Sequence, residues 1–277
     1  MLNIKQLIHA KKRGKKWAML TAYDALTSSL LEKEGVDWIL VGDSVGMVLL
    51  GYPSTVGVTM AEMLHHAKAV RRGATKAFVI ADMPFEAVSQ GAKYALACAK
   101  RFVSEAGCDA VKIEWRSDAL EIAKIIIKNK IPVMGHVGLT PQSVKKNEGF
   151  RVRGKLARDA ASVYKNAVSF EQVGAFCVLL ECVPEPVTRA VTQTLKIPTI
   201  GIGAGRACDG QVLVFHDMTG LFTKFTPRFV KRYFNGAKEL RGAAQKFVKE
   251  VRIGAFPEKK HSFMMDPLEE KGFLKKI

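Results

Sequence analysis

Six apolar segments, spread over most of the chain, each stop at a polar or ionisable residue or at a glycine. They occupy residues 38–43, 77–82, 110–114, 131–136, 176–181 and 197–203. Their hydrophobicity is continuous instead of alternating, which is typical of parallel strands that helices cover on both faces. Buried strands that repeatedly end in a polar group predict a barrel with its chemistry at one rim.

Strand-like and helix-like segments alternate along the sequence. We expect strands at 18–22, 37–42, 78–81, 110–113 and 212–215 and around residues 133, 177 and 199, with helices between them. Eight such units favour a (β/α)8 TIM barrel over an open doubly wound sheet. The length of 277 residues fits a single domain, residues 1–277. About residues 227–277 are predicted to form a C-terminal helical extension, used for packing or for oligomer contacts.

Two connections between these segments carry further signals. Residues 44–58 form a long loop with four glycines or prolines, and long loops in compact domains often carry functional residues. Thr59, with Glu62 three positions later, predicts a capping box at the start of the next helix. Residues 201–205 contain Gly-x-Gly-x-Gly late in the chain, a weak signal for a dinucleotide, so tight packing or close substrate approach is predicted there.

Cysteine content and charge narrow the class of protein. The five cysteines are odd in number and include no Cys-x-x-Cys pair, so neither a disulfide framework nor a zinc ribbon is predicted. Without a signal-peptide pattern or an apolar stretch of roughly 18 residues, the sequence predicts a cytoplasmic protein and no membrane partner. The formal net charge of +17 comes from scattered basic residues, so we expect a solvated basic surface and no nucleic-acid partner.

Carboxylates end three successive predicted strands. Asp43, Asp82 and Glu114 follow the second, third and fourth strands, whose ends converge on one face of a barrel. A single aspartate after a strand is commonly a helix N-cap, but three neighbouring carboxylates repel one another unless a cation lies among them. Oxygen ligands of this kind suit a hard ion such as Mg²⁺.

Three more ionisable residues are predicted at the same rim. Lys112 shares a strand face with Glu114, so it meets an anion, either as a structural ion pair or as a contact for a substrate carboxylate. His136 ends the fifth strand between Gly135 and Val137-Gly138, and its position at the rim favours ligand contact over a purely structural role. Glu181 ends a very apolar strand, a setting that suits a general base, although a structural carboxylate is the alternative.

Several longer motifs occur in order along the chain. They are Leu20-Thr-Ala-Tyr-Asp24, Gly42-Asp-Ser-Val-Gly-Met47, Val111-Lys-Ile-Glu114, Gly135-His-Val-Gly-Leu-Thr-Pro-Gln-Ser143, Leu180-Glu-Cys-Val-Pro184 and Ile200-Gly-Ile-Gly-Ala-Gly205. On these motifs the chain resembles the ketopantoate hydroxymethyltransferase family, also called 3-methyl-2-oxobutanoate hydroxymethyltransferase. The resemblance runs in register from about Ile4 to about His261.

The resemblance implies a reaction and a metal. Members of this family transfer a one-carbon unit from 5,10-methylenetetrahydrofolate to 3-methyl-2-oxobutanoate, which gives 2-dehydropantoate for pantothenate and coenzyme A synthesis. The same resemblance implies Mg²⁺ held at Asp43 and Asp82, with Glu114 as a further ligand. A metal of this kind stabilises the enolate that forms when C3 of the keto acid loses its proton.

The resemblance also implies roles for the remaining residues. It places the keto acid on Asp43-Ser44, Asp82 and Lys112, and it makes Glu181 the proton acceptor. His136 either bridges the keto acid and the donor or assists proton transfer. The resemblance further implies a large homo-oligomer, an octamer or a decamer.

The chain departs from the family pattern at two places, and two other functions are alternatives. The family usually has two glycines where this chain has Trp115-Arg116, and a small glycine-rich element where it has Glu148.

The nearest alternative function is that of a Mg²⁺-dependent lyase of the phosphoenolpyruvate or isocitrate lyase barrel type, but the Lys-Lys-Cys-Gly-His-like loop of those enzymes is not found in the sequence. A basic nucleic-acid-binding barrel is a second rival, which the intact set of rim residues disfavours.

Overall fold

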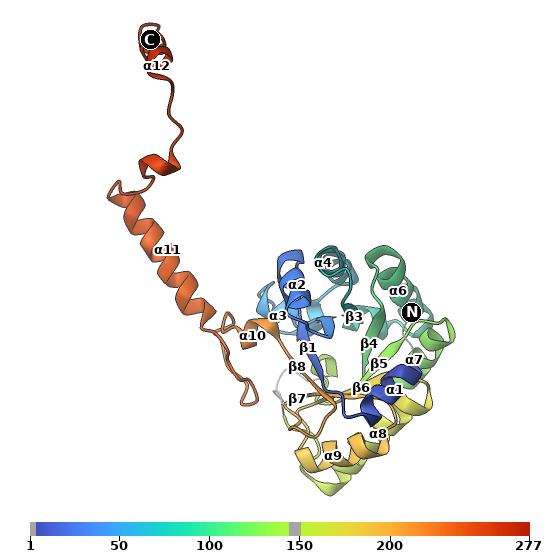
Figure 1. Ribbon diagram of the computed structural model, residues 1–277. Coiled ribbons are helices and arrows are strands. Elements are labelled where there is room, and N and C mark those ends of the chain that lie inside the picture. The colour runs from blue at the N-terminus through green and yellow to red at the C-terminus, as the bar shows by residue number, and fades with distance from the viewer. Residues whose placement is uncertain (1–3, 144–150) are drawn as a thin grey trace.

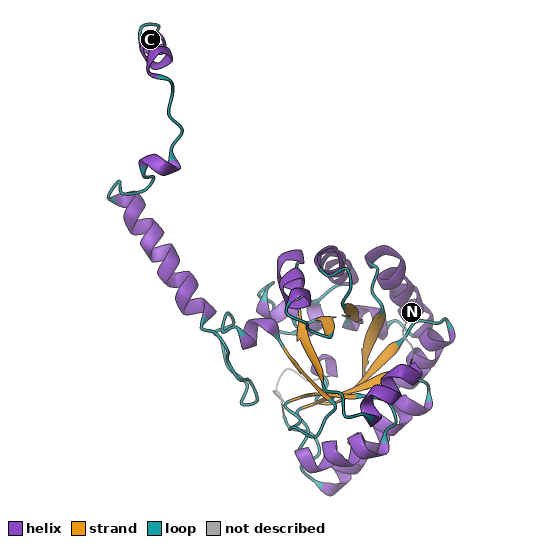
Figure 2. Cartoon of the chain, in the orientation of Figure 1, coloured by secondary structure: helices purple, strands orange, loops and turns teal. Residues whose placement is uncertain are grey.

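The protein is a closed barrel of eight parallel strands in the order β1 to β8. The computed structural model describes residues 4–143 and 151–277. The strands are β1 (Trp17–Thr21), β2 (Trp38–Val41), β3 (Phe78–Asp82), β4 (Ala110–Glu114), β5 (Val133–Gly138), β6 (Cys177–Glu181), β7 (Thr199–Ile202) and β8 (Gly210–Leu213). Figure 2 shows them as the orange centre of the molecule, with purple helices around them. The prediction of a (β/α)8 TIM barrel is confirmed.

Helices follow the first six strands and cover the outside of the barrel. They are α2 (Ala25–Lys33), α4 (Met60–Gly73), α6 (Ala92–Ala106), α7 (Ala119–Lys128), α8 (Ala157–Gln172) and α9 (Glu185–Thr194). The capping box at the start of α4 is confirmed, because Thr59 Oγ1 accepts from the Glu62 backbone N–H and the Glu62 carboxylate accepts from the Thr59 N–H.

Short helical turns fill several loops at the C-terminal ends of the strands. The segment 44–58, expected as a loop, contains α3 (Val45–Val48) and the 3₁₀ turn η1 (Thr55–Gly57). A further short helix, α5 (Phe85–Ser89), follows β3, and the 3₁₀ turn η2 (Pro141–Ser143) follows β5. These turns span only three to five residues, too few to show helical periodicity in a sequence.

The eighth strand lies two residues earlier than predicted. It ends at Leu213, and Phe215 begins the short helix α10 (Phe215–Met218). The backbone N–H of Phe215 donates to Thr21 Oγ1 at 2.9 Å, so it bonds to a side chain of β1 where α10 begins. The apolar run continues past the strand end, so composition alone does not mark this boundary.

Apolar side chains fill the barrel interior, and a second cluster lies between the strands and the helices. The interior cluster is Trp17, Met19, Trp38, Leu40, Ile80, Ala110, Met134, Phe176, Cys177, Leu179, Ile200, Ile202 and Val212. The rings of Trp17 and Trp38 lie 5.7 Å apart, and Trp38 lies 5.8 Å from Phe176. Because the interior is packed, ligands have access to the barrel only at its ends.

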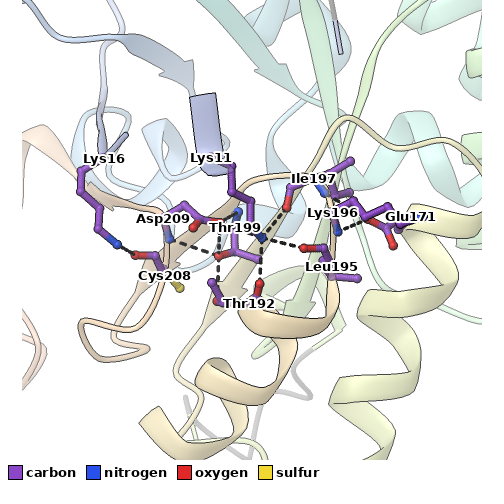
Figure 3. A network of polar contacts seen from close by, with 10 residues as sticks. All are labelled: Lys11, Lys16, Glu171, Thr192, Leu195, Lys196, Ile197, Thr199, Cys208 and Asp209. Carbon is purple, nitrogen blue, oxygen red and sulfur yellow. Dashed lines mark hydrogen bonds and ion pairs between the residues drawn. The ribbon is translucent and has the colours of Figure 1, made fainter. Parts of the chain in front are cut away.

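A polar network ties the N-terminal helix to the barrel (Figure 3). Helix α1 (Ile4–Lys12) carries Lys11, whose Nζ lies 2.8 Å from the carbonyl oxygens of Thr192, Leu195 and Ile197. Lys11 Nζ also lies 3.1 Å from Asp209 Oδ2. One ammonium group therefore satisfies carbonyl groups at the end of α9 and a carboxylate just before β8.

The C-terminal extension leaves the barrel, as Figure 1 shows. It contains α11 (Gly236–Arg252), the short turn η3 (Lys259–His261) and α12 (Pro267–Leu274). Gly236 is the one buried residue of α11, and α12 has none. The sequence predicted one terminal helix and a polar extension, whereas the extension itself contains a second helix. Within the described part of the chain, no helix is long and apolar enough to cross a membrane.

Candidate active site

A cavity of about 530 Å³ opens at the C-terminal ends of the strands. A volume of this size suits a small-molecule ligand. Its polar lining includes all seven residues that were predicted from the sequence: Asp43, Ser44, Asp82, Lys112, Glu114, His136 and Glu181. Residues from β2 to β6 meet here because parallel strands of a barrel present their C-terminal ends to one face.

The strand register brings unlike charges together in the cavity floor. Asp82 on β3 is paired with Lys112 on β4, and Glu114 on β4 is paired with His136 on β5. Lys112 Nζ lies 2.8 Å from Asp82 Oδ1 and 3.2 Å from His136 Nδ1. Burial lowers the pKa of Lys112, but the carboxylates of Asp82, Glu114 and Asp43 outweigh burial and raise it, so the side chain is an ammonium.

His136 lies between two carboxylates. Its Nδ1 is 3.6 Å from Glu114 Oε1, and its Nε2 is 3.3 Å from Glu181 Oε2 without the alignment of a hydrogen bond. Burial and the Lys112 ammonium lower the pKa of His136, while the contacts with Glu114 and Glu181 outweigh them and leave that pKa raised. The imidazole therefore connects the acidic floor of the cavity to Glu181.

Asp43 and Asp82 form the most acidic part of the site. The backbone N–H of Asp43 donates to Asp82 Oδ2 at 3.0 Å, and both side chains are buried. The pKa of Asp43 is well above its usual range because burial removes water from the carboxylate and because Asp82 and Glu114 lie near it. A cation bound beside Asp43 and Asp82 would offset the repulsion between these carboxylates and favour their charged forms.

The donor set suits a divalent ion with few protein ligands. Asp82 Oδ1 is buried, and its contact with Lys112 is not aligned as a hydrogen bond. In residues 4–143 and 151–277, no three Asp, Glu, His or Cys side chains are placed to hold a metal together. Mg²⁺ in proteins is commonly held by one or two carboxylates, with water and substrate oxygens completing its shell. Asp43 and Asp82 fit that pattern, and Glu114 as a third ligand stays a prediction.

Two neutral residues that sequence reasoning passed over support the site. Tyr23 is buried, and its hydroxyl lies 2.9 Å from Ser44 Oγ. Gln142 is also buried, and its side-chain amide donates to Asp43 Oδ2 at 2.8 Å. Both occur inside motifs that carry the family resemblance, at 20–24 and 135–143. Because their side chains are uncharged, the charge pattern of the sequence does not indicate their contacts with Ser44 and Asp43.

The outer wall of the cavity is mostly apolar, although Asp217 and Arg228 also line the cavity. It is lined by side chains from three loops and from the start of the C-terminal extension, among them Met47, Val48, Leu139, Pro141, Val152, Phe222, Phe225 and Phe229. A polar floor below an apolar wall suits a ligand with a charged reactive part and a flat or apolar remainder.

The bulky pair Trp115-Arg116 does not displace Glu114. Trp115 points outward, where its ring lies 5.6 Å from that of Phe170 in an edge-on contact, and its backbone N–H donates to the His136 carbonyl oxygen at 2.8 Å. Arg116 forms an ion pair with Asp118. Glu114 therefore keeps its place in the cavity lining. The other departure, Glu148, lies outside the described residues.

Solved structures with the same barrel include enzymes of several activities. A phosphonopyruvate hydrolase in complex with oxalate and Mg++ superposes with a TM-score of 0.59 at 15% identity, covering 100% of this chain and 97% of that one. The phosphoenolpyruvate phosphomutase of Streptomyces platensis subsp. rosaceus gives a TM-score of 0.62 at 16% identity, covering 99% and 96%. At these identities the likeness shows the fold alone.

Sequence relatives are much closer. The 3-methyl-2-oxobutanoate hydroxymethyltransferase of Syntrophus aciditrophicus (strain SB) is 51% identical over 254 residues, covering 92% of this chain and 93% of the relative. The enzyme of the same name from Desulfotalea psychrophila is 49% identical over 257 residues, covering 93% and 92%. Residues 1–259 match the family described as ketopantoate hydroxymethyltransferase. The chain belongs to this family of transferases, which acts in pantothenate biosynthesis.

Proposed function

We propose that the enzyme transfers a one-carbon unit from 5,10-methylenetetrahydrofolate to C3 of 3-methyl-2-oxobutanoate and forms 2-dehydropantoate. One observation carries the proposal: Lys112, the paired carboxylates Asp43 and Asp82, and Glu181 all line one cavity. The reaction needs a cation for the substrate carboxylate, a site for an electrophilic metal, and a base for C3. The cavity offers a residue for each of these tasks.

The keto acid would bind on the floor of the cavity. Asp43 and Asp82 would hold Mg²⁺, and Glu114 lies close enough to add to the negative charge around it. A bound Mg²⁺ would withdraw electron density from the keto group and make the C3 proton more acidic. Lys112 would bind the substrate carboxylate, and the Ser44 hydroxyl, held by Tyr23, would donate to the same anion.

Glu181 is the proposed base. Its side chain is 18% exposed, the most accessible of the ionisable groups that surround His136, so it can reach a substrate atom in the cavity. His136 Nε2 lies 3.3 Å from Glu181 Oε2, so the two side chains are in contact at the edge of the cavity. After Glu181 removes the C3 proton, the carbon bonds to the one-carbon unit of the donor, and one water supplies the hydroxyl group of the new hydroxymethyl substituent. Both bonds from the one-carbon unit to the donor nitrogens break, and tetrahydrofolate leaves with two protons on those nitrogens, one from Glu181 and one from the water.

The apolar outer wall is the proposed site of the folate donor. Its side chains face the same cavity as Glu181, and a planar ring system stacks well on apolar surface of this kind. The lyase alternative has less support, because the barrels named as lyases, such as 2,3-dimethylmalate lyase at 14% identity, are similar in fold alone.

Product formation tests the proposal directly. Purified protein is incubated with Mg²⁺, 5,10-methylenetetrahydrofolate and 3-methyl-2-oxobutanoate, and 2-dehydropantoate is measured by mass spectrometry. We expect product that depends on all three components. A parallel incubation with 2,3-dimethylmalate tests the lyase alternative, and cleavage of that compound without formation of 2-dehydropantoate would contradict the proposal.

We also propose that the enzyme is a homo-oligomer in which α11 contacts another copy of the chain. Leu240, Phe247 and Val251 share one face of α11 and are 62%, 55% and 47% exposed. On the barrel, the outward side chains of Ala18 on β1 and Gln211 on β8 are exposed. The same chain thus has an apolar helix face and a part of the barrel, at β1 and β8, that no helix in the described ranges covers. These two surfaces support association between copies.

A further inference from the structure

Gln142 lies behind the acidic side of the cavity and contacts the ends of three strands. It is the middle residue of η2, and the residue before it, Pro141, lines the cavity. Gln142 itself is 7% exposed, and the Ser143 N–H closes the turn by donating to the Thr140 carbonyl oxygen at 2.9 Å. The turn therefore presents the Gln142 side chain to the barrel instead of to solvent.

Both hydrogens of the Gln142 side-chain amide are used. Nε2 donates to Asp43 Oδ2 at 2.8 Å and to the Met83 carbonyl oxygen at 2.9 Å. Because both partners are acceptors, the NH₂ group and not the amide oxygen must face them. The Met83 peptide is itself fixed, since its N–H donates to the Lys112 carbonyl oxygen at 3.0 Å. One hydrogen thus anchors the amide, and the other holds one oxygen of Asp43.

The main chain of Gln142 holds a second carboxylate. Its N–H donates to Glu114 Oε2 at 3.0 Å, which leaves Glu114 Oε1 on the side of His136 Nδ1. A single residue therefore fixes which oxygens of Asp43 and Glu114 are available to the cavity.

We propose that Gln142 is a positioning residue of the cation site, which holds Asp43 in the rotamer that offers Oδ1 to the ion. This role rests on the proposed function, because it requires a divalent cation at Asp43 and Asp82. Gln142 does not line the cavity, so it acts through Asp43 and not by contact with substrate. Hydrogen-bonding partners of metal ligands typically change metal affinity by about 10–100-fold when they are removed.

The test is the affinity for Mn²⁺ alone, measured by isothermal titration calorimetry on the full chain. Gln142→Met keeps the approximate length of the side chain and removes both donated hydrogen bonds, and we expect its Mn²⁺ dissociation constant to rise about 10–100-fold. The matched control is Gln211→Met, because Gln211 Nε2 donates to the Gly205 carbonyl oxygen at 2.9 Å on the exposed face of β8. The control should bind Mn²⁺ like the wild type.

A double-mutant comparison separates positioning from a general loss of structure. Asp43→Asn removes the carboxylate on which Gln142 acts, so adding Gln142→Met to it should weaken Mn²⁺ binding no further. If Gln142→Met does not fold, Gln142→Ala also removes both hydrogen bonds that the side chain donates, and the same loss of affinity is expected.

Three results would overturn the inference, and they are distinguishable. Wild-type affinity in folded Gln142→Met overturns the positioning role alone. An equal loss in Gln211→Met shows that the effect does not depend on Asp43. Absence of Mn²⁺ binding by the wild type overturns the cation site of the proposed function, and the positioning role with it.

Discussion

Lys112 Nζ lies 2.8 Å from Asp82 Oδ1, and the two residues occupy paired positions on the neighbouring strands β4 and β3. The side chains are 5% and 4% exposed, so water screens this pair very little. A buried ion pair is costly to break on one side, because the remaining charge keeps its desolvation penalty without a partner. The pair thus serves both the structure and the proposed binding of the keto acid.

Lys112→Met is expected to lower both stability and activity. Loss of the ammonium leaves Asp82 beside Asp43 without compensation, at a cost of about 3–5 kcal/mol in the free energy of unfolding. Because Lys112 is the proposed partner of the substrate carboxylate, the KM for 3-methyl-2-oxobutanoate should rise by roughly 10-fold or more, as expected for loss of a charged hydrogen bond. The control is Lys68→Met, which breaks the exposed pair with Glu105 and should cost under about 1 kcal/mol. Equal effects of the two variants would contradict the role of Lys112.

Asp217 should make stability depend on pH. It lines the cavity, and burial raises its pKa from 3.8 to about 6, while Arg232 acts in the opposite direction. In the unfolded chain the carboxyl ionises at lower pH, so its contribution to stability falls as the pH rises from about 4 to about 6 and is constant above that window. Asp217→Asn removes this loss. Its melting temperature relative to the wild type should therefore be higher above pH 6 than at pH 4, and a difference that does not change with pH would refute the assignment.

Lys11→Met tests the network beneath the barrel. The substitution leaves three carbonyl oxygens and Asp209 without their shared cation, and we expect a loss of about 2–4 kcal/mol in stability. This corresponds to a melting temperature roughly 5–15 °C lower. Activity at 25 °C should change little, because the network lies away from the cavity lining. The neighbouring exposed residue Lys12 gives the control, Lys12→Met, and an equal effect there would show that the network adds nothing.

Phe247→Glu tests the proposed interface on α11. A charge on the apolar face should weaken contacts between copies, which light scattering coupled to size-exclusion chromatography would detect as a smaller mass. Gly242→Glu places the same charge on the helix where an added Cβ meets nothing within 4 Å, and it should leave the mass unchanged. The proposal is wrong if the wild type is a monomer or if Phe247→Glu has the wild-type mass.

Much of the site was predictable because the C-terminal ends of consecutive strands lie next to one another in a parallel barrel. Asp43, Asp82 and Glu114 are far apart in sequence, yet Asp82 and Glu114 each end a strand and Asp43 lies two residues after one, so the topology alone predicts that they meet. The alternation of side chains along β4 likewise placed Lys112 beside Glu114 in the cavity.

Other features depend on contacts that a sequence does not display. Gln142 and Tyr23 act through hydrogen bonds across loops, and a neutral residue in a loop carries no periodic or charge signal. Just after the end of β8, the Phe215 N–H donates to Thr21 Oγ1, a contact between residues far apart in the sequence. The C-terminal extension has an apolar helix face that this barrel does not cover, and the sequence of one chain does not display the proposed contact of that face with another copy.

The proton on C3 of 3-methyl-2-oxobutanoate tests the central claim most directly. The keto acid is incubated in D₂O with Mg²⁺ and enzyme but without folate, and loss of the C3 proton signal is followed by NMR. Wild-type enzyme should catalyse the exchange. Glu181→Gln should abolish it while binding Mn²⁺ normally, and Glu121→Gln, on the exposed face of α7, should exchange at the wild-type rate. Undiminished exchange by Glu181→Gln would contradict the assignment of the base and transfer that role to His136.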